Sequence, residues 1–178
     1  MSDEQRKNLL RLTGDGSWIS SRSGWKSDSA TAFGTEVVSR AADGKNDDTG
    51  YPGIGLVPRK GGSVTLSFWC KASQECEVVS HLFGDMKNER NAKKHADDGT
   101  SHADGLVVAR VGTEWTYVRH TWTYDEDPWR GPMMIVARLT RVPVGVTVSV
   151  AGVMLVEGDT PAAWAPAEGE TLTGGALS

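Results

Sequence analysis

The sequence predicts an all-β sandwich, and three observations lead to this prediction. Apolar and polar residues alternate with a period of two in several segments, most clearly in VTLSFWCKAS at residues 64–73. About nine or ten such segments are separated by turn signals, among them Gly61-Gly62 and Pro143. Almost none of the chain has a helical period, which argues against an α/β enzyme core.

The expected strands can be placed in chain order. In residues 112–124, Val118, His120 and Trp122 share one face, while Tyr117 and Arg119 share the other. The apolar run at 133–142 predicts a strand buried on both sides, and the last strand is long enough to bend at Gly152. The complete set is 8–12, 35–41, 53–57, 64–73, 76–83, 105–111, 112–124, 133–142 and 144–158.

One helix is expected, in DMKNERNAKKHA at 85–96. Asp85 suits an N-cap, and Glu89 with Lys93 forms an i,i+4 pair. Because an apolar stripe is almost absent, this helix should be exposed within a polar loop insertion at 84–105. Deleting residues 86–103 is then expected to leave the sandwich folded.

Length and charge narrow the function classes. With 178 residues, the chain suits one domain at 8–169, flanked by tails at 1–7 and 170–178. The net charge is -4 and no dense basic stretch appears, which argues against a nucleic-acid partner. No apolar run predicts a transmembrane helix, and the polar N-terminus does not resemble a signal peptide, so an internal origin or release by lysis is expected. Cys70 and Cys76 are expected as free thiols, with pairing across a hairpin as the alternative.

The C-terminal stretch VAGVMLVEGDTPAAWAPAEGE at 150–170 resembles a known pattern. It is similar to the closing strand of the carbohydrate-binding-module-like jelly rolls of phage and prophage tail proteins. The matching residues are Leu155, Glu157, Gly158, Ala163, Trp164, Pro166, Ala167 and Glu168. Residues 8–10, 64–73 and 112–124 resemble three further strands of that family, while His120 and the insertion at 84–105 depart from it.

The resemblance implies a jelly roll that acts as a non-catalytic accessory protein of a phage virion and contributes to adhesion to host-surface glycan. The expected partners are other virion proteins, host cell-wall polysaccharide and further copies of the chain, and the expected location is the virion, assembled in the host cytoplasm. One alternative is a purely structural assembly or decoration protein of the head or tail. The other is a carbohydrate-binding module detached from a glycan-degrading enzyme, which the missing signal peptide disfavours.

Aromatic side chains outside the core are the candidate glycan-binding residues, because the C–H faces of sugars stack on Trp and Tyr rings. Trp69, Tyr117 and Arg119 should point away from the core, and Trp129 and Trp25 lie in the turn-like stretches DEDPWRG and SRSGWKS. For each ring taken singly, the competing interpretation is favoured: it packs a loop onto the sandwich or contacts a neighbouring subunit.

Two acidic stretches are candidate metal sites. HADDGTSHADG at 95–105 reads like a ligand set, but its histidines are seven residues apart and no terminal Glu follows, so neither the zinc nor the EF-hand pattern fits. The favoured interpretation is a solvated insertion with turn-forming Asp and Gly, and the further alternative is a contact loop for a partner, through His95, Asp97, Asp98, His102 and Asp104. Asp43, Asp47 and Asp48 are hard oxygen ligands that could hold a structural calcium, although a polar turn is the favoured interpretation.

The sequence predicts no enzyme activity, no catalytic residue and, apart from that calcium, no cofactor. Glu114 and the acids at 125–127 sit at strand ends, where acidic residues are common. No Ser-His-Asp or Cys-His arrangement has the required context, and His81 and His120 fall within strands.

Overall fold

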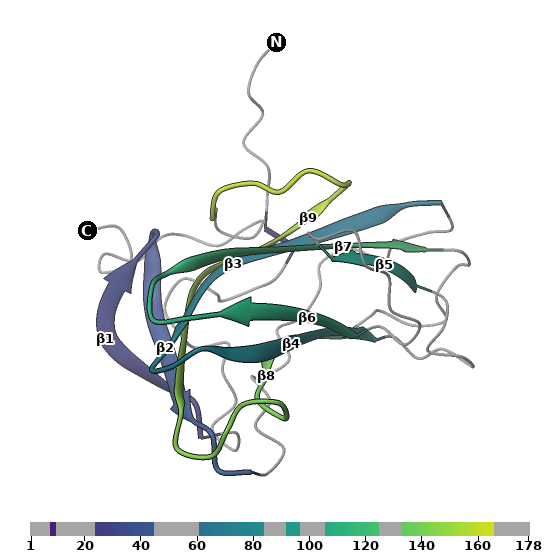
Figure 1. Ribbon diagram of the computed structural model, residues 1–178. Helices are drawn as coiled ribbons and strands as arrows, with labels where there is room; N and C mark the ends of the chain where they lie inside the picture. Colours follow the sequence, from purple (N-terminus) through teal and green to yellow (C-terminus); the bar gives the residue numbers. More distant parts are fainter. Residues whose placement is uncertain are drawn as a thin grey trace.

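The computed structural model describes residues 8–9, 24–44, 61–83, 92–96, 106–124 and 133–165, and these form two antiparallel sheets (Figure 1). One sheet has six strands in the order β1-β2-β9-β3-β7-β5, and the other has three in the order β6-β4-β8. The strands are β1 (Lys26–Ala32), β2 (Thr35–Ala41), β3 (Ser63–Ala72), β4 (Cys76–Phe83), β5 (Ala92–Ala96), β6 (Leu106–Val111), β7 (Thr116–Tyr124), β8 (Met133–Arg138) and β9 (Thr147–Glu157).

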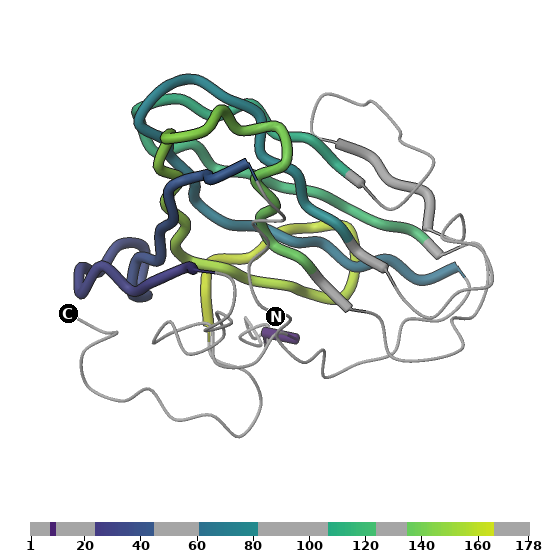
Figure 2. Tube along the Cα trace, turned by 90° about the horizontal axis from the view of Figure 1, so that it is seen from below, coloured from purple at the N-terminus to yellow at the C-terminus, as the bar shows by residue number. Residues whose placement is uncertain are grey.

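The strand order confirms the predicted jelly-roll sandwich. After the β1–β2 hairpin, successive strands alternate between the sheets: β3, β5, β7 and β9 belong to the six-stranded sheet, and β4, β6 and β8 belong to the other. The last strand, β9, lies between β2 and β3 rather than at an edge. Sequence-distant strands are therefore neighbours in both sheets, as jelly rolls require. In Figures 1 and 2 the β1–β2 hairpin projects at one side of the molecule.

The two sheets enclose one apolar core. Leu66 and Phe68 of β3 and Trp122 of β7 are completely buried there, as the alternation of each strand predicts. Burial of each such side chain contributes about 2–3 kcal/mol relative to its exposure. Ile135 and Val136 of β8 are both buried, which confirms the prediction of a strand covered on both sides.

The predicted helix at 85–96 is wrong, because Ala92–Ala96 form the edge strand β5. Its register with β7 pairs Lys94 with Trp122 and His95 with Thr121. Without an apolar stripe a helix gains little from packing, whereas a strand satisfies the main-chain groups of the β7 edge. Part of the predicted insertion thus belongs to the sheet, and deleting residues 86–103 would remove that strand.

Strand β1 was not predicted. Its sequence, KSDSATA, has no apolar alternation, and nearly all of its residues are exposed. It is held by pairing with β2, from Lys26 opposite Ser39 to Ala32 opposite Thr35. The predicted segments 10–12 and 53–57 lie outside the described residues, as do both predicted tails. Within the described ranges, no helix is long and apolar enough to cross a membrane.

The start of the predicted first strand is anchored to β9. The Asn8 amide donates a hydrogen bond to the carbonyl of Val153 at 2.9 Å, and its oxygen accepts one from the Leu155 N–H at 3.0 Å. The N–H of Leu9 donates to the carbonyl of Leu155 at 2.8 Å. Asn8 is 2% exposed, so these bonds satisfy a polar side chain away from water.

Candidate functional site

Two aromatic side chains lie side by side on the outer face of the six-stranded sheet. The register pairs Trp69 of β3 with Tyr117 of β7, and their ring centroids are 4.9 Å apart at an interplanar angle of 37°. The flanking residues Phe68 and Val118 point into the core, so the alternation of both strands turns these rings outward. Both rings are half-buried.

A third ring extends this row from the β1–β2 hairpin. Phe33 lies flat on Trp69, with ring centroids 4.1 Å apart and planes 5° from parallel. Phe33 and Gly34 form the two-residue turn, with φ of 53° and 87°. Two positive φ values are the requirement of a type I′ turn, whose first position favours Asn, Asp or Gly. A phenylalanine there costs about 1–2 kcal/mol of backbone strain, yet the residue remains 41% exposed.

Gly152 makes room for these rings. Between the pairs Trp69–Ala151 and Ser67–Met154, β9 has two residues where β3 has one, so β9 carries a bulge. Gly152 lies in this bulge with φ of +64°, and a Cβ there would lie 3.2 Å from the Phe33 Cβ and 3.3 Å from the Trp69 Cδ1. Its N–H donates a 2.8 Å hydrogen bond to the Thr35 hydroxyl, which fixes the hairpin over the bulge.

A fourth ring and two cations complete the arrangement. Trp115 meets Phe33 edge-on, with centroids 5.4 Å apart and an interplanar angle of 84°. The Lys71 ammonium lies 4.8 Å from the centroid of Trp115, and the Arg119 guanidinium carbon lies 5.8 Å from that of Tyr117. Both distances fall within cation–π range. We call Phe33, Trp69, Trp115 and Tyr117 the aromatic patch.

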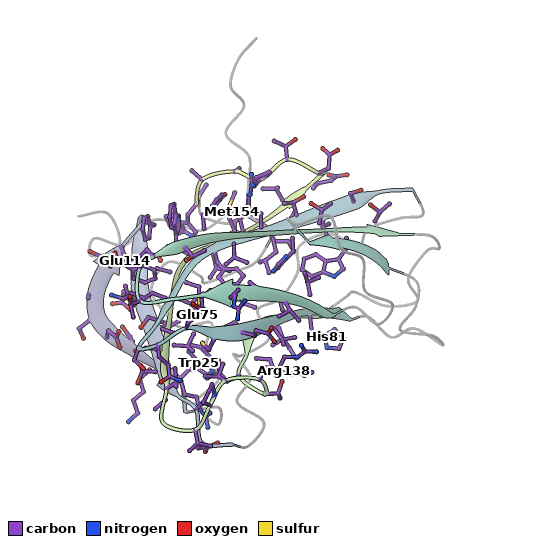
Figure 3. The ribbon with its side chains drawn as sticks, viewed as in Figure 1. Trp25, Glu75, His81, Glu114, Arg138 and Met154 are labelled. Atoms are coloured by element: carbon purple, nitrogen blue, oxygen red, sulfur yellow. The ribbon has the colours of Figure 1, made fainter. Side chains whose placement is uncertain are left out.

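The chain's own C-terminal segment covers the adjoining part of the same face. In Figure 1 the segment after β9 folds back over β3 and β9. The Thr65 hydroxyl donates to the carbonyl of Gly158 at 2.7 Å, and the Ser67 hydroxyl donates to that of Ala162 at 3.4 Å. Met154, labelled in Figure 3, is buried beneath this segment and clusters with Ala165, which belongs to the segment. The aromatic patch therefore occupies the part of the face beside this covering.

Trp164, the tryptophan of the C-terminal motif, also lies near the hairpin. Its ring is half-buried, and its Cε3 atom is 3.3 Å from where a Cβ on Gly34 would lie. A side chain at Gly34 would therefore press on the ring. The C-terminal segment and the β1–β2 turn thus pack on one another beside the aromatic patch.

The structure brings together Trp69, Tyr117 and Arg119, three of the five predicted glycan-binding residues. The prediction that Trp25 lies outside the core, in a turn-like stretch, is wrong: the residue is 3% exposed and belongs to the core (Figure 3). Gly24, with φ of +75°, precedes it, and the Arg40 side chain fills the space beside this glycine, so the chain turns inward before β1. Trp129 lies outside the described residues.

Sequence reasoning missed Phe33, Trp115 and Lys71. For two of them a signal was present, because Trp115 continues the outward series of Tyr117 and Arg119, and Lys71 continues that of Trp69. For Phe33 the sequence offers only a turn signal, the glycine that follows it at position 34. Its position over Trp69 depends on the long-range pairing of β2 with β9, which no local pattern predicts.

The predicted metal and contact residues fall mostly outside the described part of the chain. Asp47, Asp48, Asp97, Asp98, His102 and Asp104 lie outside it, and His95 lies in β5. Asp43 is described, and its carboxylate accepts a 3.1 Å ion-paired hydrogen bond from Arg40. Within the described ranges, no group of three or more His, Cys, Asp or Glu could hold a metal ion. The calcium site and the contact loop stay predictions.

The two described histidines of the strands, His81 and His120, lie in structural surroundings. His81 is buried with its Nδ1 atom 3.5 Å from the Arg138 guanidinium (Figure 3), and His120 is buried edge-on to Trp122 at 6.0 Å. Glu114 is exposed at the turn before β7, and the acids at 125–127 lie outside the described residues.

Cys70 and Cys76 are both buried, free thiols, as expected. Burial raises the pKa of Cys70 far above its ordinary value, and the neighbouring Cys76 raises it further. Burial also raises the pKa of Cys76. A raised pKa keeps a thiol protonated and poorly nucleophilic at neutral pH, so neither is suited to act as a nucleophile.

Comparison with known proteins places this geometry among similar folds. No protein-family model and no curated protein sequence matches the chain. One solved structure that resembles it is a CBM4 carbohydrate-binding module, with 15% identity and a TM-score of 0.47, and the match covers 68% of this chain and 70% of that one. Another is a family 16 carbohydrate-binding module, with 16% identity and a TM-score of 0.43, and the match covers 68% of this chain and 77% of that one. The tripod from the baseplate of bacteriophage Tuc2009 is also similar, with 13% identity and a TM-score of 0.43, and the match covers 93% of this chain and 60% of that one. At such identities and TM-scores, any functional conclusion depends on the residues of this chain.

Proposed function

We propose that this protein is a non-catalytic glycan-binding module of a phage virion and that the aromatic patch is its binding surface. The observation that supports this most directly is the exposed Phe33 ring, held in a turn conformation that disfavours it and stacked on Trp69. Backbone strain of this kind concentrates at functional sites. Planar apolar rings bordered by donors suit a sugar, which presents C–H faces and hydroxyl edges.

The virion part of the proposal depends on the sequence resemblance of residues 8–169 to the jelly rolls of phage tail proteins. In this setting the module would attach to other virion proteins, in one or more copies, and present the aromatic patch to the host surface. Labelling purified particles with an antibody to the protein tests this part, and particles without the label would contradict it.

A second candidate, a purely structural virion role, is supported by a specific observation. Phe33 covers one face of Trp69, and Tyr117 lies against the same indole, so these rings pack on each other as well as offering a surface. In that case the stack would only hold the β1–β2 hairpin on the sheet. The two roles differ in one property, which is binding of glycan by the purified protein.

Retention on bacterial polysaccharides and isolated cell walls, measured by affinity electrophoresis, tests the glycan-binding role. We expect weak retention, reduced by Trp69→Ala in protein whose circular dichroism shows a folded sandwich. Absence of retention on walls and on a broad polysaccharide panel would contradict glycan binding and favour the structural role.

A further inference from the structure

The aromatic patch is closed along β3 by the C-terminal segment. Thr65 and Ser67 belong to the same outward series as Trp69, yet each of the two is only 1% exposed. The C-terminal segment explains this burial, because the carbonyls of Gly158 and Ala162 accept hydrogen bonds from the two hydroxyls at 2.7 and 3.4 Å. A glycan that contacts Trp69 therefore cannot continue along β3 over these two residues.

The β1–β2 hairpin closes a second side of the patch. The Phe33 ring covers one face of the Trp69 indole, with centroids 4.1 Å apart and planes 5° from parallel. The hairpin is held in this place, since the Gly152 N–H donates a 2.8 Å hydrogen bond to the hydroxyl of Thr35, which is completely buried. A glycan therefore has the outer face of Phe33 to stack on, and not the covered face of Trp69.

The aromatic surface that remains accessible is small. Among the side chains that the structure describes, Phe33 is the one exposed aromatic residue, at 41%. The other three rings of the patch are half-buried. Along the row from Trp115 to Tyr117, successive ring centroids are 5.4, 4.1 and 4.9 Å apart. Because a pyranose is about as broad as one aromatic ring, the row has room for about two or three sugar units.

We infer that the aromatic patch binds a short oligosaccharide segment of about two or three sugar units and does not follow a longer run of polysaccharide. This inference rests on the proposed glycan-binding function and specifies the size of its ligand. On an open sheet face each further unit would find another contact, and affinity would keep rising with chain length. Here the C-terminal segment and the hairpin close two sides, so further units meet no other exposed ring among the described side chains.

The test measures affinity against chain length. Partial acid hydrolysis of the polysaccharide that the protein retains, followed by size fractionation, gives fragments of about one to six sugar units. Calorimetry then gives the affinity of each fragment, corrected for the number of overlapping positions at which it can bind. Each unit up to the second or third should raise the affinity about two- to ten-fold, and longer fragments should bind within about two-fold of the three-unit fragment.

Phe33→Asn locates this binding, and Val144→Asn is the matched control, since Val144 is 72% exposed and lies outside the patch. Phe33→Asn should weaken binding of the three-unit and six-unit fragments by the same factor, because both use the same rings, whereas Val144→Asn should weaken neither.

Three results would overturn the inference and leave glycan binding intact. They are a rise of more than about two-fold beyond three units, a smaller effect of Phe33→Asn on the longer fragment, and fragments that fail to bind although the polymer does. Failure of every polysaccharide and cell wall to bind, or no effect of Phe33→Asn on either fragment, would overturn the aromatic patch as the binding surface and the inference with it.

Discussion

The phenyl ring of Phe33 lies parallel to the indole of Trp69, although the two residues are 36 positions apart in the chain and belong to different parts of the sheet. The contact joins the β1–β2 turn to the outer face of β3 across the bulge in β9. It places an exposed aromatic side chain where turn chemistry favours a small polar residue. The first two predictions concern this contact.

Phe33→Asn should lower the affinity for glycan while leaving the stability of the fold nearly unchanged. Asparagine adopts positive φ more readily than phenylalanine, which offsets the loss of a stacked pair worth about 0.5–1.5 kcal/mol. We therefore expect the free energy of unfolding in urea to change by less than about 1 kcal/mol, while glycan affinity falls about ten-fold or more.

Val144→Asn is the control for this variant, since Val144 is another exposed apolar side chain, 72% exposed and outside the aromatic patch. It should leave binding unchanged. Equal affinity of Phe33→Asn and wild type would show that the ring has no part in binding.

Gly152→Ala should disturb the contact between Phe33 and Trp69, because Gly152 of β9 lies against both residues. The new methyl would lie 3.2–3.3 Å from atoms of Phe33 and Trp69, at a backbone φ of +64° that alanine disfavours. We expect a loss of about 1–3 kcal/mol in unfolding free energy, measured by urea denaturation. Gly112→Ala, where a Cβ meets nothing within 4 Å, should be nearly neutral. Similar losses in both variants would contradict this account of Gly152.

Asn8 should stabilise the sandwich through its two bonds to β9. Asn8→Ala leaves the Leu155 N–H and the Val153 carbonyl without this partner, and we expect a loss of about 1–3 kcal/mol in thermal or urea unfolding. Asn8→Asp retains an acceptor but buries a charge, so it should be no more stable than Asn8→Ala. A neutral Asn8→Ala would show that the two side-chain hydrogen bonds of Asn8 contribute nothing to stability.

The buried thiols should make stability decline at alkaline pH. Because burial raises the folded-state pKa of Cys70, the folded protein keeps this proton while the unfolded chain loses it above its ordinary value of 9.0. The stabilisation is complete below that pH and is lost progressively as the pH rises. Between pH 9.5 and 10.5, unfolding free energy should fall more steeply in wild type than in Cys70→Ala, by about 1 kcal/mol per pH unit. Identical slopes would contradict the assignment.

The strands that could be predicted from sequence were those with a strong period of two. Residues 76–83 coincide with β4, and the alternation in β3 and β7 correctly separates Phe68 and Trp122 from Trp69 and Tyr117. In these segments local pattern and tertiary burial agree, so the prediction needs no knowledge of neighbouring strands.

The failures occurred where pairing partners determine the structure. Strand β1 lacks an apolar face and depends on β2, while β5 depends on the edge of β7. Trp25 precedes a polar strand and enters the core only because the chain turns at Gly24. For the same reason, strand alternation predicts Trp69 and Tyr117 and could also have predicted Trp115, but Phe33 needed the three-dimensional register of the hairpin.

The central claim, that the aromatic patch binds glycan, is tested most directly by the tryptophan indole N–H signals in a ¹H–¹⁵N spectrum, assigned by single Trp→Phe variants. On titration with the polysaccharide that the protein retains, the signals of Trp69 and Trp115 should shift with saturation, whereas those of the buried Trp25 and Trp122 should remain in place. Saturating shifts confined to other indoles, with Trp69 and Trp115 unchanged, would contradict the claim.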